Sequence, residues 1–250
     1  MQLLPINQLS PLLWDSQMMG FGVARVLLND LAPLALAELL AAARHQGLAL
    51  LYLVASPVDA RSNASARQAG AWLADRKATF VMPVAAGLAQ TPAAAAVTVE
   101  PTTEWTARLE DLALQSGAYS RFRRDPRLPS SVFVGIYREW LRKSLSGELA
   151  RQVLVGYASA GPGGPKQPDG LLTLGSQHGR ADVGLLAVAA EARGQGIGQR
   201  LVQAAQRQAA LWKFDELQVV TQLENVLACR FYRRCGFVES VVEHVYHLWL

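Results

Sequence analysis

Residues 183–201 read Val183-Gly-Leu-Leu-Ala-Val-Ala-Ala-Glu-Ala-Arg-Gly-Gln-Gly-Ile-Gly-Gln-Arg-Leu201. A run of aliphatic residues leads into a short turn, and glycines then open a segment whose apolar residues recur at helical spacing. Glycines in such a turn let a ligand approach the backbone closely, and the first amides of the helix have no acceptor within it. Because a helix N-terminus of this kind favours anions, the sequence predicts that a pyrophosphate binds at Gly194–Gly198.

The spacing of these glycines distinguishes between phosphate-binding motifs. A dinucleotide fingerprint requires Gly-x-Gly-x-x-Gly, but counting from Gly194 puts Gln199 at the third position. A P-loop is excluded as well, since no Gly-Lys-Ser/Thr follows. The pattern is instead Arg193-x-x-Gly196-x-Gly198. An alternative is that these glycines form only a flexible connection between a strand and a helix.

A second motif follows downstream, Asn225-x-x-Ala228-x-x-Phe231-Tyr232-x-x-x-Gly236-Phe237. Together, in this order and spacing, the two motifs resemble the two signatures of the GNAT superfamily of N-acetyltransferases. The resemblance implies acetyl-CoA as cosubstrate, a primary amine as acceptor and no metal. It implies that these residues contact the cofactor: Leu186, Ala187, Val188, Arg193, Gly194, Gln195, Gly196, Ile197, Gly198 and Asn225. The alternative for Phe231-Tyr232 is core packing.

The family mechanism is direct attack of the amine on the thioester, without a covalent enzyme intermediate. The resemblance implies that the Leu185–Val188 strand is splayed from its neighbour and that its amides stabilise the developing oxyanion. It also implies that Tyr232 is catalytic and protonates the departing thiolate. The proton acceptor stays open between water and four side chains: Glu104, Tyr119, His178 and Asp182.

The composition of the chain restricts its class, its ligands and its location less sharply than the two motifs do. The chain has 250 residues, 51% of them hydrophobic and 18% charged, which is typical of a folded globular protein. A net charge of +4 favours an anionic ligand, but the basic residues are scattered, so nucleic acid is not an expected partner. Cys229 and Cys235 are predicted to be free thiols, and no His or Cys stands at metal-ligand spacing. With no signal peptide and no membrane-spanning segment, the expected location is the cytoplasm.

The pattern along the chain predicts a small N-terminal α/β domain over residues 1–85. Its expected elements are strands Gly22–Leu28, Leu48–Ala55 and Ala78–Met82, with helices Pro33–Gln46 and around Ser65–Trp72. Residues 86–102, rich in Ala, Thr and Pro, are predicted to be a linker.

Residues 103–250 are predicted to form the acetyltransferase domain. Its expected helices are Glu104–Ser116, capped by Thr102 or Thr103, Ser131–Ser146, capped by the Ser130-Ser131 pair, Gly196–Trp212 and Asn225–Arg234. Its expected strands are Gln152–Ser159, Gly170–Leu174, Asp182–Val188, Leu217–Thr221 and Val238–Trp249. This order predicts an α/β or α+β sandwich around a mixed, mostly antiparallel sheet, which is the fold that the resemblance implies.

Three further segments bear on the acceptor. Trp14-Asp15-Ser16-Gln17-Met18-Met19-Gly20, Ser120-Arg121-Phe122 and Tyr137-x-x-Trp140 resemble segments of TDP-fucosamine N-acetyltransferases, which act on a nucleotide-linked amino sugar in bacterial polysaccharide synthesis. The resemblance implies such an acceptor, with Trp14, Arg121 and Phe122 as substrate-binding residues, and a possible homodimer. The chain departs from that family at Met18-Met19, in a longer Gly161–Asp169 turn and at Phe231.

The residues themselves leave other interpretations open. The arginines around Phe122 suit a diphosphate, but they also fit a solvated basic loop: Arg121, Arg123, Arg124 and Arg127. Trp14 could line a pocket or be a buried structural residue. The alternative functions are acetylation of a peptide, protein or small-molecule amine, and CoA binding without catalysis.

Overall fold

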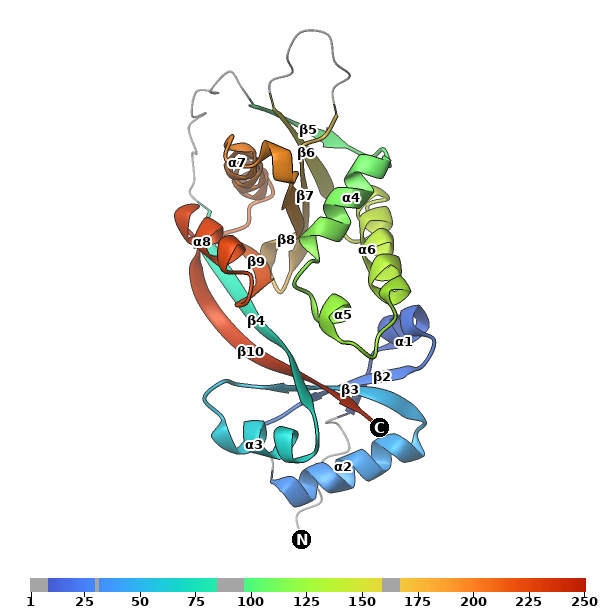
Figure 1. Cartoon of the computed structure of the whole chain (residues 1–250). Coiled ribbons are helices and arrows are strands. Elements are labelled where there is room, and N and C mark those ends of the chain that lie inside the picture. Colours follow the sequence, from blue (N-terminus) through green and yellow to red (C-terminus); the bar gives the residue numbers. More distant parts are fainter. Residues whose placement is uncertain (1–8, 30–31, 85–96, 159–166) are drawn as a thin grey trace.

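The computed structural model describes residues 9–29, 32–84, 97–158 and 167–250. Their strands form one continuous ten-stranded sheet in the order β1-β2-β3-β10-β4-β9-β8-β7-β6-β5 (Figure 1). Only the β2–β3 and β8–β9 pairs are parallel, and the other seven are antiparallel. The predicted α/β fold with a mixed, mostly antiparallel sheet is therefore confirmed.

The N-terminal part contributes four strands of this sheet. Its elements are β1 (Leu9–Pro11), α1 (Leu13–Met19), β2 (Gly22–Leu27), α2 (Pro33–His45), β3 (Leu48–Ala55), α3 (Ala60–Gln68) and β4 (Trp72–Pro83). Helices α2 and α3 lie beside β3 and cover an apolar cluster of their own (Figure 1).

The helix expected around Ser65–Trp72 was misplaced. The Asp59 carboxylate accepts the N–H of Ser62 and starts α3 at Ala60. The helix ends at Gln68, because Gly70, with a φ of 83°, turns the chain into β4. Trp72 therefore begins a strand, and that strand is longer than the expected one.

The C-terminal part contains every helix and strand that the sequence predicted there. Its elements are α4 (Ala107–Ser116), α5 (Arg121–Arg124), α6 (Ser130–Leu145), β6 (Gln152–Ala158), β7 (Gly170–Gln177), β8 (Arg180–Val188), the short 3-10 helix η2 (Ala190–Ala192), α7 (Ile197–Leu211), β9 (Glu216–Gln222), α8 (Val226–Arg234) and β10 (Val238–Trp249). The strand–helix–strand–helix–strand order after β7 follows the prediction.

The expected caps of α4 and α6 were wrong. Thr106, not Thr102 or Thr103, caps α4, and its hydroxyl accepts the Leu109 N–H at 3.2 Å. The N-cap of α6 is Pro129, with no side-chain cap, because the first serine of the expected pair already belongs to the helix. Helix α4 therefore begins later than predicted, at another threonine, whereas α6 begins without a side-chain cap.

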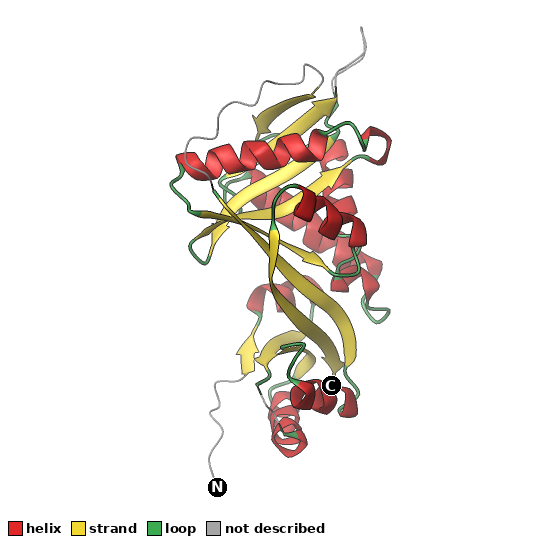
Figure 2. Ribbon diagram, turned by 90° about the vertical axis from the view of Figure 1, so that its left-hand side faces the viewer, coloured by secondary structure: helices red, strands yellow, loops and turns green. Residues whose placement is uncertain are grey.

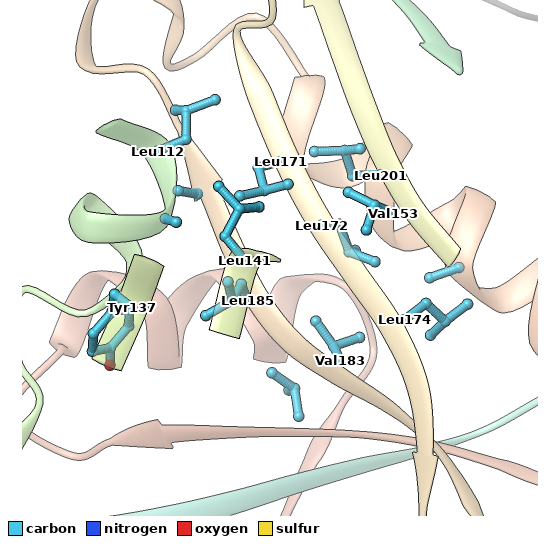
Figure 3. Packing of buried hydrophobic residues seen from close by; sticks show 14 of the residues in the cluster. Leu112, Tyr137, Leu141, Val153, Leu171, Leu172, Leu174, Val183, Leu185 and Leu201 are labelled. Atoms are coloured by element: carbon cyan, nitrogen blue, oxygen red, sulfur yellow. The ribbon is translucent and has the colours of Figure 1, made fainter. Parts of the chain in front are cut away.

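Helices cover both faces of the β6–β8 part of the sheet (Figures 1 and 2). Alternate side chains of β7 point to opposite faces. Leu171 lies toward Leu112 of α4 and Leu141 of α6, and Leu172 lies toward Leu201 of α7 (Figure 3). This two-sided core holds the ends of β8 and α7 in place.

The expected linker is partly a strand. Its last residues form β5 (Val97–Thr102), which pairs with β6 from Val97–Ala158 to Thr102–Val153; residues 85–96 lie outside the described residues, as does most of the Gly161–Asp169 turn. The sheet also crosses the expected domain boundary, since β10 lies between β3 and β4. The division into domains 1–85 and 103–250 stays a prediction.

Candidate active site

A cavity of about 1080 Å³ opens where β8, β9, α7 and α8 meet, and residues of α4 and α6 also line it. It brings together most of the residues that the two sequence motifs singled out. The following line it: Leu186, Ala187, Val188, Arg193, Gly194, Gly196, Ile197, Gly198, Asn225 and Tyr232. Gln195 is exposed on the glycine turn and is not among the lining residues.

The parallel strands β8 and β9 separate at the cavity. They pair only from Ala181–Leu217 to Val183–Val219, although β8 continues to Val188 and β9 to Gln222. Beyond Val183 of β8 and Val219 of β9 the two strands no longer pair. Residues Gly184 to Val188 of β8 therefore line the cavity. The predicted splay is therefore present.

An irregularity in β8 shapes this open edge. The register with β7 shifts between Leu172, opposite Leu186, and Leu174, opposite Val183. Within this bulge the Leu185 N–H donates to the Thr173 hydroxyl at 2.8 Å instead of to a strand partner. Bulges of this kind redirect backbone groups beside a binding site.

The glycine turn holds the start of α7 against the cavity. Gly194 and Gly196 have φ values of 79° and 83°, which only glycine adopts without strain, and Gly196 is the N-cap of α7. A Cβ on either would meet no atom within 4 Å, so the space above the turn is open. Arg193 Nε donates to the Val188 carbonyl at 3.2 Å and ties the turn to β8. The free amides of the first turn of α7 fit a diphosphate.

Tyr232 lies in the cavity wall on α8, with only 5% of its surface exposed. The rings of Phe80, Phe231 and Phe237 surround it at centroid distances of 6.0, 5.4 and 5.7 Å. Burial raises the pKa of Tyr232, so its phenol keeps its proton at neutral pH. On the same helix the side-chain oxygen of Asn225 accepts the Ala228 N–H and caps α8.

Another part of the cavity wall is aromatic. Tyr119, Tyr137 and Trp140 line it. Two of the three residues predicted to bind substrate lie one layer behind this wall. The Trp14 ring stacks on the Trp140 ring at a centroid distance of 6.0 Å, and the Phe122 ring packs edge-on against the Trp140 ring at 5.9 Å.

Arg121 lies in the same layer, over the rings of Tyr52 and Phe122 at 4.8 and 4.3 Å. None of the three predicted substrate-binding residues is among those that line the cavity. In this structure they support its aromatic wall from behind.

A buried polar cluster surrounds Arg121, and sequence reasoning missed it. His247 Nδ1 lies 2.6 Å from Asp125 Oδ2, and Asp75 is 2% exposed. Among the described residues, Asp75 Oδ1, Arg121 Nε and His247 Nε2 have no hydrogen-bond partner. Burial raises the pKa of Asp75 to about 6, against the partial opposing effect of Arg121. The available signal was a lone acid within a strand-like run, Trp72-Leu-Ala-Asp75.

The four side chains considered as proton acceptors lie in different places. Tyr119 lines the cavity. Asp182 precedes the splay and accepts a hydrogen bond from Gln218 Nε2 at 2.8 Å. Glu104 is exposed, and His178 occupies the β7–β8 turn with a φ of 51°.

Both cysteines are free, as predicted. Cys235 lines the cavity, and burial raises its pKa to about 11, so it is a thiol at neutral pH. Within the described ranges, no three His, Cys, Asp or Glu side chains come together in a group able to hold a metal ion. No helix in those ranges combines the length and the apolar character needed to cross a membrane.

Residues 103–237 match the family model described as "Acetyltransferase (GNAT) family". The chain is also similar to the spore coat polysaccharide biosynthesis protein SpsD of Bacillus subtilis (strain 168), with 29% identity over 139 residues. That alignment covers 56% of this chain and 46% of SpsD, so the chain spans less than half the length of this relative.

Solved structures share the fold at low identity. A functionally unknown conserved protein from Staphylococcus epidermidis superposes with a TM-score of 0.63 at 16% identity, covering 98% of this chain and 92% of that one. A GCN5-related N-acetyltransferase from Sphaerobacter thermophilus gives 0.56 at 14% identity, covering 96% and 76%. These likenesses concern the arrangement of the backbone.

Proposed function

The chain belongs to the acetyltransferase (GNAT) family, and from this we propose that it transfers an acetyl group from acetyl-CoA to the amino group of a nucleotide-linked amino sugar. One observation carries the proposal: a single cavity contains the glycine-opened start of α7, the open edge of β8 and the buried phenol of Tyr232. A diphosphate site, an oxyanion site and a proton donor are what thioester aminolysis requires.

The glycine turn supports the donor half of the reaction. The unpaired amides after Gly194 and Gly196 would hold the diphosphate of CoA, and Arg193 adds a positive charge beside them. The thioester would then extend between β8 and β9, where the strands have separated and no sheet bonds have to be broken.

The residues of the chain divide the chemistry between them. As the amine nitrogen bonds to the acetyl carbon and the carbon–sulfur bond breaks, the amides of β8 that face its open edge beyond Val183 would stabilise the negative oxygen. Tyr232 would protonate the departing thiolate, since its phenol is neutral and lines the cavity. The ammonium proton leaves the amine before attack, to water or to a nearby base. The second proton, which the nitrogen loses as the amide forms, returns directly or through water to the Tyr232 phenolate.

Two observations support a sugar nucleotide as acceptor. SpsD, by its name, is a polysaccharide biosynthesis protein. The acceptor side of the cavity has an aromatic wall of Tyr119, Tyr137 and Trp140, which suits stacking with a base or sugar ring. Trp14, Arg121 and Phe122 would set the shape of this wall from behind, and Arg121 would supply charge toward a diphosphate.

The test is acetylation of a panel of amines by the purified protein. The panel contains dTDP-4-amino-4,6-dideoxygalactose, a UDP-linked amino sugar, free glucosamine and unacetylated peptides, and release of CoA thiol is followed together with the product mass. We expect acetylation of at least one sugar nucleotide at a higher kcat/KM than any other amine. Activity confined to peptides or to glucosamine would refute the acceptor and leave the acetyl transfer intact.

A further inference from the structure

The buried polar cluster around Arg121 extends to the cavity through Gln222. Asp75 of β4 is buried and is not among the residues that line the cavity. The side chain of Gln222, the last residue of β9, lines the cavity and donates a hydrogen bond to the Asp75 carboxylate. Gln222 therefore connects a buried acid with the space where substrates would bind.

Gln222 and Tyr232 lie on opposite faces of the sheet. Val219 of β9 is paired in register with Phe80, and the Phe80 ring packs against the Tyr232 ring at a centroid distance of 6.0 Å. Alternate residues of a strand point to opposite faces, and Gln222 is three residues after Val219 on a strand without irregularities. The side chain of Gln222 therefore points to the face away from Tyr232.

This face is the acceptor side of the cavity. Gln222 is paired with Lys77, and Asp75, two residues before Lys77, points to the same face. Burial, and to a smaller extent the nearby charge of Asp75, raise the pKa of Tyr137, a residue of the aromatic wall. If the thioester lies between β8 and β9 with Tyr232 on one side, an acceptor against the aromatic wall approaches from the other side, past Gln222.

An amide held in this way offers a hydrogen-bond acceptor to a ligand. Because the NH2 group of Gln222 donates to Asp75, its carbonyl oxygen, Oε1, is the group left to face a partner. An amine or ammonium group is a donor and matches this oxygen. A neutral carbonyl stabilises the ammonium form less than a carboxylate in direct contact would, so the amine can still lose its proton before attack.

We propose that Gln222 binds the amino group of the acceptor and holds it toward the thioester, and that Asp75 is the positioning residue that orients the Gln222 amide. The inference rests on the proposed function, because it takes the thioester to lie between β8 and β9. It does not depend on which sugar or nucleotide carries the amine. Strand β4, which contributes Asp75, lies outside residues 103–237, so the N-terminal part of the chain would shape the acceptor site.

The experiment measures steady-state kinetics with the amine of the acetylation panel that the unaltered protein acetylates at the highest kcat/KM. Gln222→Met removes the amide and keeps the length of the side chain. Gln218→Met is the matched control, because Gln218 lies on the same face of β9, donates to the Asp182 carboxylate at 2.8 Å and does not line the cavity. Calorimetry gives the Kd for acetyl-CoA, and thermal unfolding checks the fold of every variant.

We expect Gln222→Met to lower kcat/KM for the amine roughly ten- to a hundredfold, the range of one hydrogen bond to a charged group. The Kd for acetyl-CoA should stay within about twofold, because the contact is made to the acceptor alone. Gln218→Met should keep both values. An equal fall of kcat/KM in the two variants, a loss confined to acetyl-CoA binding, or no loss at all would overturn the proposal. If the unaltered protein acetylated no amine of the panel, the proposed function itself would fail.

Two substitutions of Asp75 test whether it acts through Gln222. Asp75→Ala leaves the Gln222 amide without its acceptor and should lower kcat/KM about as much as Gln222→Met does. Asp75→Asn keeps a carbonyl oxygen for the amide and should lose less. In the Gln222→Met background Asp75→Ala should add little, because two residues that act through one contact are not additive. If the two effects multiplied instead, the positioning role of Asp75 would be wrong.

Discussion

At the scale of single residues, Tyr232 should be required for the chemical step and not for binding. Its hydroxyl lies in the wall of the cavity, and its raised pKa keeps it protonated. Tyr232→Phe removes only the oxygen, so the packing against Phe80 and Phe237 should persist. We expect kcat at saturating acetyl-CoA to fall at least about a hundredfold, the lower end of general acid catalysis.

Calorimetry of the same variant separates the two roles. The Kd for acetyl-CoA should stay within about twofold of the original, because loss of a transition-state proton donor leaves ground-state binding unchanged. A variant that bound acetyl-CoA poorly but turned over normally when saturated would assign Tyr232 to binding instead.

Asp75 should make stability depend on pH in a direction opposite to most carboxylates. Burial raises its pKa from 3.8 to about 6, so the folded protein holds the proton more tightly than the unfolded chain does. The stabilising contribution is therefore complete below about pH 4 and is lost as the pH rises through about 6. Arg121 and Lys77 favour the charged form, Glu224 opposes it, and the side chain of Gln222 donates to it.

Asp75→Asn removes this charge while keeping the shape. We expect the variant to gain about 2 kcal/mol over the original protein at pH 8 relative to pH 4.5, which is most of the linkage from a pKa difference of about two units. Urea denaturation at the two pH values measures the difference. If the substitution changed the free energy of unfolding equally at the two pH values, folding would not raise the pKa of Asp75.

At the scale of elements, the connection from β8 to α7 depends on Gly196. Alanine there is forced into a left-handed conformation, at a cost of roughly 1–2 kcal/mol, and the turn would shift to relieve it. Gly196→Ala should therefore raise the Kd for CoA at least about tenfold. Gly147→Ala is the matched control, since Gly147 has a similar φ of 85°, a Cβ there would also meet nothing within 4 Å, and it does not line the cavity.

Gly196→Ala and Gly147→Ala should lower the stability measured by thermal unfolding by similar amounts. Only Gly196→Ala should weaken the binding of CoA. If Gly147→Ala weakened CoA as much as Gly196→Ala, the effect would come from general destabilisation, and the glycine turn would have no specific part in binding.

At the scale of the whole molecule, the continuous sheet should make unfolding cooperative. Strand β10 lies between β3 and β4, and one apolar cluster runs from Met19 to Val245. Far-UV circular dichroism and tryptophan fluorescence should therefore follow the same urea curve. Trp14 and Trp212 report from distant parts of the chain. Two separate transitions would instead support independent domains over residues 1–85 and 103–250.

What could be predicted from the sequence was local. The glycine turn, α7 and α8 carry their signals within a few residues, in glycines, caps and apolar spacing, so their bounds agree with the prediction to within a residue. The proposed cofactor half of the site follows from these elements, because Gly194–Gly198 and Tyr232 lie near their ends.

Only the tertiary structure decided which distant segments meet. Strand β10 was predicted with correct bounds, yet its place between β3 and β4 depends on long-range pairing that no short pattern encodes. The same holds for Asp75, whose neighbours come from other elements, and for Trp14, which lies behind Trp140. Helix and turn signals arise from backbone geometry within one segment, whereas pairing and burial arise from packing of the entire chain.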